Sequence, residues 1–73
     1  MRRIADPAEV QVGRHGLYVR TWLRSGVLLP QVPVEWGWGR EEFLRQTCRK
    51  AGLAPDCYKD KSTELWVFEA EVF

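Results

Sequence analysis

The sequence has no apolar run that approaches the roughly 18 residues a membrane-spanning helix requires. It also has no excess of either charge, because 11 basic side chains are balanced by 10 acidic ones. A partner that is recognised mainly by charge is therefore not expected. Two arginines follow Met1, but no apolar stretch follows them, so we expect no secretory signal and a cytoplasmic protein.

Residues that bind metals or act as nucleophiles are scarce. His15 is the single histidine, and it stands between glycines, where we expect a polar turn residue rather than a ligand. The two cysteines, Cys48 and Cys57, match neither a zinc site nor a redox motif, so we expect two thiols rather than a disulfide. The sequence also contains no glycine-rich phosphate loop or nucleophile elbow. We therefore assign no metal, no cofactor and no catalytic residue.

What the sequence does contain is enough apolar material for a small core. Hydrophobic residues make up 45% of the 73 positions, and four of them are tryptophans. A chain of this length buries a smaller share of its surface than a larger domain does, so its stability is expected to be marginal. We expect residues 1–73 to form a single domain.

The stretch Gly26–Trp38 stands out because it combines two prolines with two tryptophans and several aliphatic residues. Pro30 and Pro33 each lack a backbone donor and have a fixed φ, so the stretch fits no helical period. We predict a short strand at Val27–Leu29, followed by an extended crossing that ends where a helix begins.

Strand patterns precede this stretch. Val10–Val12 alternates apolar and polar residues, and Leu17–Trp22 does the same over a longer range. Arg24–Gly26 is typical of a three-residue hairpin loop, with Gly26 in the left-handed conformation. We therefore expect an antiparallel meander in which the strand from Leu17 is central.

The clearest element is a helix over residues 40–51. Its apolar positions form one stripe, and Gly39 stands at the N-cap without a capping side chain. Gly52 at the position after the C-cap, followed by Pro55, predicts the end of the helix. The stripe consists of Phe43, Leu44, Thr47, Cys48 and Ala51.

The last predicted strand is Glu64–Phe73, which alternates throughout. Its wholly apolar face is expected to meet the helix; this face consists of Trp66, Phe68, Ala70 and Val72. We therefore predict an α+β fold, in which a small antiparallel sheet of three or four strands packs against one main helix over residues 40–51. Trp66, Phe68, Phe43 and Leu44 are predicted to form the centre of the core.

Six short segments together resemble the AMMECR-like domain family. The resemblance runs from Asp6 to Phe73 and covers only the later part of that domain. The family's Leu-Arg-Gly-Cys-Ile-Gly motif belongs to the earlier part and is absent here. The segments are Val12-Gly-Arg-His-Gly-Leu17, Leu28-Leu-Pro-Gln-Val32, Glu35-Trp-Gly-Trp38, Phe43-Leu-Arg-Gln-Thr-Cys48, Lys50-Ala-Gly-Leu53 and Phe68-Glu-Ala-Glu-Val-Phe73.

The resemblance implies an unestablished biochemical activity, with a binding or structural role as part of a larger domain or assembly. The candidate binding residues are Arg14, His15, Gln31, Glu35 and Trp36.

Two alternative functions stay open. Arg14, His15 and Glu35 could form half of a catalytic site that a missing half or second subunit completes. Single-stranded nucleic acid could instead stack on Trp22, Trp36 and Trp38 beside Arg14, Arg20 and Arg24.

A piece of a larger domain is expected to expose apolar surface that the missing part would cover. Leu65 and Val67 oppose the predicted core face, and Tyr18 and Trp22 share one side of their strand. We therefore expect a homo-oligomer, or a protein partner that covers this surface. A membrane partner is not expected, and nucleic acid is the less favoured one.

Overall fold

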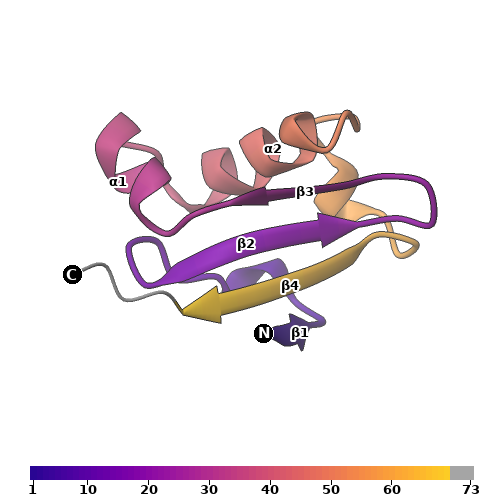
Figure 1. Cartoon of the computed structure of the whole chain (residues 1–73), viewed down its shortest axis with the longest axis horizontal. Coiled ribbons are helices and arrows are strands. Elements are labelled where there is room, and N and C mark those ends of the chain that lie inside the picture. The colour runs from indigo at the N-terminus through magenta and orange to yellow at the C-terminus, as the bar shows by residue number, and fades with distance from the viewer. Residues whose placement is uncertain (70–73) are drawn as a thin grey trace.

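The computed structural model of the chain describes residues 1–69. It consists of a four-stranded antiparallel sheet with helices on one side, which confirms the predicted α+β fold (Figure 1). The elements in chain order are β1 (Arg2–Ile4), the 3-10 turn η1 (Pro7–Glu9), β2 (His15–Arg20), β3 (Ser25–Leu28), α1 (Gln31–Trp36), α2 (Arg40–Lys50), the 3-10 turn η2 (Cys57–Lys59) and β4 (Glu64–Glu69).

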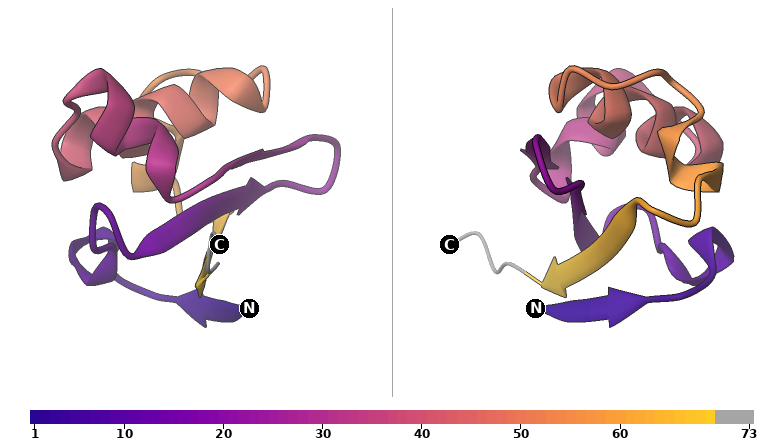
Figure 2. Two further views of the ribbon diagram at one scale, coloured as in Figure 1. Left: turned by 60° about the vertical axis from the view of Figure 1, so that its left-hand side comes forward. Right: turned by 90° about the vertical axis from the view of Figure 1, so that its right-hand side faces the viewer.

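The strand order in the sheet is β1-β4-β2-β3, so β2 is an inner strand as predicted. The last strand does not lie at the edge, because β4 inserts between β1 and β2 and pairs antiparallel with both. Figure 2 shows α1 and α2 together on one side of the sheet, with β1 farthest from them. We call the side that faces α2 the inner face and the opposite side the outer face.

The predicted helix is confirmed as α2, with bounds that differ by one residue at its C-terminal end. All five residues of its predicted stripe are buried. Gly39 is the N-cap and makes no side-chain hydrogen bond. At the other end Gly52 has φ +77°, and its N–H and that of Leu53 donate to the Arg49 and Cys48 carbonyls. These two bonds form a Schellman motif, which ends the helix as the sequence predicted.

The register of β4 places the predicted core residues on the wrong side. Leu65 pairs with Val19 and Val67 pairs with Leu17, and all four side chains are buried on the inner face. Trp66 and Phe68 therefore point to the outer face, and the predicted core centre was wrong for these two residues. The error arose because both sets alternate in β4 and both are apolar, so the pattern alone does not choose a face. Ala70 and Val72 lie outside the described residues.

The stretch after β3 was wrongly predicted to be extended. Gln31–Trp36 forms α1, with Pro30 in helical conformation at its N-cap and Gly37 at φ +70° at its C-cap. Pro33 is only the third residue of this helix. The first N–H groups of a helix have no intrahelical acceptor, so a proline there removes no hydrogen bond. A helix of six residues is thus compatible with both prolines.

The first ten residues hold more structure than was predicted. β1 adds a fourth strand at the β4 edge, with Ile4 paired to Leu65. η1 follows, and its N-cap Asp6 forms a capping box with Glu9. Val10–Val12 is not a strand, so that prediction was wrong, and Val10 is instead buried in the core. β1 has only one buried residue, which is why no alternation marked it.

The β2–β3 loop lies earlier than predicted. Arg20 pairs with Ser25, so the loop is residues 21–24, and the Thr21 N–H donates to the Arg24 carbonyl at 2.7 Å. Gly26 is a strand residue and does not have the predicted left-handed conformation. A Cβ at this position would stand 2.6 Å from the backbone nitrogen of Ala51. Glycine is therefore required because the end of α2 approaches β3 closely.

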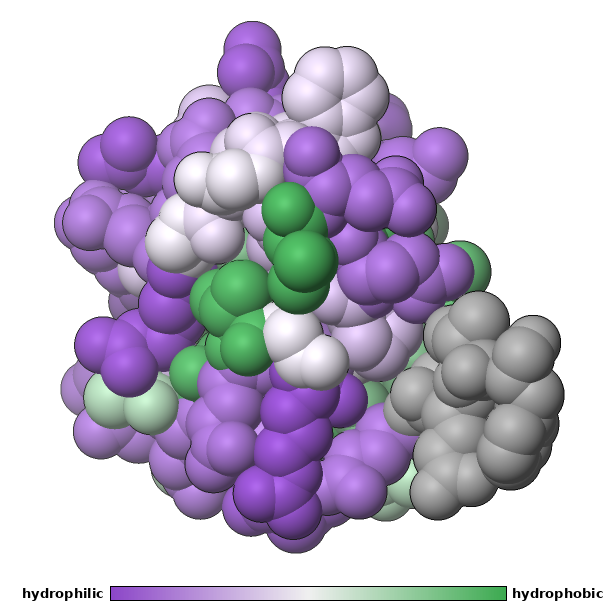
Figure 3. Space-filling model, turned by 90° about the vertical axis from the view of Figure 1, so that its left-hand side faces the viewer, coloured by the Kyte–Doolittle hydropathy of each residue, from purple (hydrophilic) through white to green (hydrophobic). Residues whose placement is uncertain are grey.

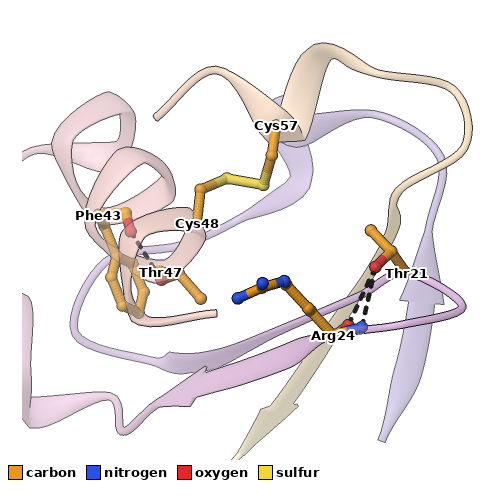
Figure 4. Close-up of a disulfide and its surroundings, with 6 residues drawn as sticks. All are labelled: Thr21, Arg24, Phe43, Thr47, Cys48 and Cys57. Carbon is orange, nitrogen blue, oxygen red and sulfur yellow. Dashed lines mark hydrogen bonds between the residues drawn. A yellow bond between two sulfur atoms is a disulfide. The ribbon is translucent and has the colours of Figure 1, made fainter. Parts of the chain in front are cut away.

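Cys48 and Cys57 form a disulfide, which corrects the prediction of two thiols. Figure 4 shows the bond between the C-terminal half of α2 and the turn η2. The two Cα atoms are 5.8 Å apart, a separation that suits a disulfide. The Schellman end of α2 reverses the chain and makes this approach possible, which the nine-residue spacing alone did not reveal.

Candidate functional site

The outer face of the sheet carries large apolar side chains without a helix above it. Tyr18 pairs with both Trp66 and Val27, so these three side chains form a row across β4, β2 and β3. Tyr18 and Trp66 are half-buried, and Val27 is 44% exposed. We call this row, together with Phe68, the outer aromatic row.

Phe68 completes the row through a glycine. It pairs with Gly16 on β2, and its ring occupies the space that a Cβ on Gly16 would need. An aromatic ring that covers a cross-strand glycine shields the strand backbone from water. Because Gly16 presents no side chain, the Phe68 ring can occupy this space, and it is half-buried there. The outer aromatic row therefore extends along β4 from Trp66 to Phe68.

Charged side chains border the row. Arg3 pairs with Trp66 on the β1 side, and Arg20 pairs with Glu64 at the far end of the strands. The Trp66 Nε1–H donates to the Glu64 carboxylate at 3.3 Å, so this indole has a polar partner although its ring is half-buried. An apolar centre with a charged border is the arrangement found in protein interfaces.

Among the predicted binding residues, His15 is placed differently from the expectation. It is the first residue of β2 and is buried, so it is not a turn residue. Its Nδ1 accepts a hydrogen bond from the Gln11 backbone N–H at 3.1 Å. Burial lowers the pKa of the His15 imidazole, and the positive charge of Arg14 lowers it further. The ring is thus a neutral structural group that holds the 11–14 turn.

The other four predicted residues lie at the same end of the molecule but do not converge. Arg14 forms an ion pair with Glu69 at 2.8 Å. Gln31 begins α1, and its Oε1 is buried without a partner among the described residues. Glu35 and Trp36 lie on the exposed side of α1.

α1 and the 11–14 turn are in contact, because a Cβ on Gly13 would lie 3.6 Å from Val34 Cγ2. Figure 3 views this end of the molecule and shows apolar side chains gathered at the centre of a polar surface. Trp36, 70% exposed, stacks on Trp38 with ring centroids 6.2 Å apart.

The tryptophans proposed for nucleic-acid stacking are separated. Trp36 and Trp38 stack on each other near α1, whereas Trp22, 90% exposed, lies in the β2–β3 loop. Figure 1 places this loop and α1 at opposite ends of the molecule. The arginines named with them are split in the same way. No continuous stacking platform results from these residues.

Other site classes find no support in residues 1–69. This range holds no cluster of three metal-ligating side chains of the His, Cys, Asp or Glu type. Within the same range, no helix has both the length and the apolar character to cross a bilayer.

The outer aromatic row is the feature that sequence reasoning placed wrongly, since Trp66 and Phe68 were assigned to the core. The pairing of Trp66 with Tyr18 would have revealed it.

The AMMECR1 family model matches residues 1–73. A relative from Thermococcus gammatolerans is 60% identical over 67 residues, and one from Aquifex aeolicus is 52% identical over the same length. Each alignment covers 92% of this chain, but only 33% and 34% of the respective relative. The chain thus spans about a third of the length of these relatives.

A solved structure agrees with this result. The crystal structure of the uncharacterised protein PH0010 from Pyrococcus horikoshii is similar to this chain with a TM-score of 0.92 and 52% sequence identity. The match covers 96% of this chain and 37% of that one. From the family match, the relatives and this likeness together, the chain belongs to the AMMECR1 family.

Proposed function

We propose that the chain is a binding module whose outer aromatic row docks against a second layer of polypeptide, and that in the isolated chain this layer is a second copy. The observation that carries the proposal is the half-buried aromatic surface on the side of the sheet that neither α1 nor α2 covers (Figure 2). A contiguous apolar surface seldom stays bare on a soluble protein. The proposal includes a cytoplasmic location.

The length of the relatives supports the need for a second layer. The matched part is about a third of each relative, so most of their chain lies outside it. We propose that this chain corresponds to the later part of a longer domain, whose remainder occupies the outer face. A second copy offers the same apolar character with Arg3 and Glu64 at the border, and these opposite charges suit a twofold contact.

At the α1 end, two of the predicted binding residues already have partners within the chain, so binding is assigned to the outer face. Arg14 already has Glu69 as a partner, and His15 is buried against Gln11. Ile4 and Val10 also cover the inner face, so Leu65 and Val67 are not exposed as the sequence suggested. The N-terminal segment therefore contributes to the core and does not fold over the outer aromatic row.

The test is light scattering across a range of protein concentrations on three chains. The parent is expected to increase in mass with concentration, and Trp66→Thr is expected to stay monomeric. Trp36→Thr is the matched control, since it removes the same side chain from α1, where it is 70% exposed and lies away from the outer face. Circular dichroism confirms that each variant is folded. A parent that is monomeric at its highest soluble concentration, or equal effects of the two substitutions, contradicts the proposal.

A further inference from the structure

The Cys48–Cys57 disulfide joins the helix α2 to the turn η2. Cys48 lies in the buried stripe of α2 and is 0% exposed, whereas Cys57 in η2 is 8% exposed. Figure 4 shows the two sulfur atoms bridging the gap between α2 and the turn. This observation is independent of the outer face and of the proposed function.

The same two segments form the walls of a groove of about 620 Å³. One wall is the exposed side of α2, and the other is the chain around η2. The lining residues are Glu42, Arg45, Gln46 and Arg49 from α2, and Pro55, Asp56, Tyr58 and Lys59 from the second wall. The disulfide is the covalent tie between the walls, apart from the main chain that connects them through residues 51–54.

The backbone hydrogen bonds of the second wall are local. The N–H groups of Cys57, Lys59 and Asp60 donate to carbonyls three residues earlier, at 2.9, 2.9 and 3.0 Å. Within the part of the chain that is described, no hydrogen bond joins residues 54–60 to α2 or to the sheet. The second wall is therefore held by the disulfide and by burial of Cys57 and Tyr58.

We infer that the Cys48–Cys57 disulfide is a redox-sensitive latch whose reduction releases the 54–60 wall and opens the groove while the sheet stays folded. The sheet keeps its buried pairs in both states, because Leu17, Val19, Leu65 and Val67 do not depend on the bond. The Cys48 thiol remains a small apolar side chain in the α2 stripe.

The reductant is a dithiol, and the exchange balances as follows. One thiolate of the dithiol attacks Sγ of Cys57, the more accessible cysteine, and forms a mixed disulfide. The Cys48–Cys57 bond breaks, and Cys48 leaves as a thiolate that takes up a proton. The second thiol of the reductant then displaces Cys57, which also becomes a thiol. Two electrons and two protons pass to the protein, and the reductant ends as a disulfide.

Amide hydrogen exchange with and without dithiothreitol tests the latch. Reduction is expected to speed exchange at Cys57, Lys59 and Asp60 by about tenfold or more, since a closed loop of this size no longer restrains them. The amides of Leu17 and Val67 are expected to stay protected. Thiol alkylation of the reduced chain is expected to reach Cys57 before Cys48.

The double substitution Cys48→Ala/Cys57→Ala is the matched control. It is expected to show fast exchange at Lys59 and Asp60 both with and without dithiothreitol, because it has no bond to reduce. Unchanged exchange in the reduced parent would overturn the latch, since the wall would then be held by packing alone. Loss of protection at Leu17 together with Lys59 would also overturn it, since the bond would then support the whole fold.

Discussion

The two faces of the sheet are built from adjacent residues of the same strands, yet they differ in side-chain type and in cover. The inner face consists of aliphatic residues that are almost fully buried under α2, such as Leu17 and Val67. The outer face consists of larger aromatic residues that are only partly buried, such as Tyr18 and Trp66. Side-chain size therefore does not mark the core of this protein, and none of its four tryptophans is buried.

The comparison separates two requirements on the chain. The inner face must fill the space below α2 without voids, because cores are packed as closely as organic crystals. For the proposed docking role, the outer face only needs an apolar surface that is easily desolvated. Substitutions on the two faces are therefore expected to act on different properties, stability for the inner face and association for the outer face.

The largest difference is expected between neighbours on β2. Leu17→Ala removes a side chain that is 0% exposed and is expected to cost about 2–5 kcal/mol of unfolding free energy. Tyr18→Ala, measured at low protein concentration, is expected to cost less than half as much, because its ring keeps contact with solvent. Urea denaturation measures both values. Equal losses would show that the outer face is as important to folding as the inner one.

Two strand glycines sharpen the comparison, because one lies on each face. Gly26→Ala on the inner face is expected to cost about 1–3 kcal/mol, since its Cβ would meet the backbone of Ala51. Gly16→Ala on the outer face is expected to cost less, because the Phe68 ring that its Cβ would meet can rotate away. Thermal melts of the two variants give the order. A larger loss for Gly16→Ala would mean that the Phe68 ring is fixed in place.

His15 adds a pH dependence to the inner face. Its folded-state pKa is lowered by burial, so the unfolded chain binds a proton more readily. The stabilising contribution is fully present above the unfolded pKa of about 6.5 and is lost as pH falls through the folded value. Urea midpoints are expected to fall between neutral pH and the mildly acidic range in the parent, and to fall less in His15→Gln. Parallel pH profiles would exclude this role.

The smallest effect is expected at the start of α2, the helix that makes the inner face a core. Gly39 has extended backbone angles that any residue adopts, and nothing lies within 4 Å of a Cβ placed there. Gly39→Asp is expected to stabilise the chain by a few tenths to about 1 kcal/mol, through capping and the helix dipole. A lower melting temperature at neutral pH would argue against a free N-cap. Gly39→Ala separates the capping effect from the loss of backbone freedom.

Most of the fold class followed from local patterns. The α2 stripe, its N-cap at Gly39 and its end at Gly52 were all predicted, because helical period and capping chemistry are set by nearby residues. The hairpin was located within a few residues, but its loop was misplaced because Gly26 had two possible uses. A glycine that permits a turn and a glycine that permits close packing look the same in a sequence.

The candidate site was predicted less well. Tyr18 was named as a surface candidate and lies half-buried on the outer face, whereas Trp66 and Phe68 were wrongly assigned to the core. The five predicted binding residues do lie near one end, but His15 is buried and Arg14 is paired. The ion pair of Arg14 and the strand pairing of His15 both involve Glu69 of β4, a residue distant from them in sequence. No local pattern contains that information.

The sequence by itself determined that this chain forms an α+β structure with one amphipathic helix, because hydrophobic period and caps act over a few residues. Only the tertiary structure decided which face of β4 is buried, because a period of two allows either face until the strand pairs with its neighbours. It also decided that Cys48 meets Cys57, because the approach depends on how the chain turns after Gly52. Pairing with distant strands decided the face of β4, and the path of the chain after Gly52 decided the disulfide; a hydrophobic pattern encodes neither.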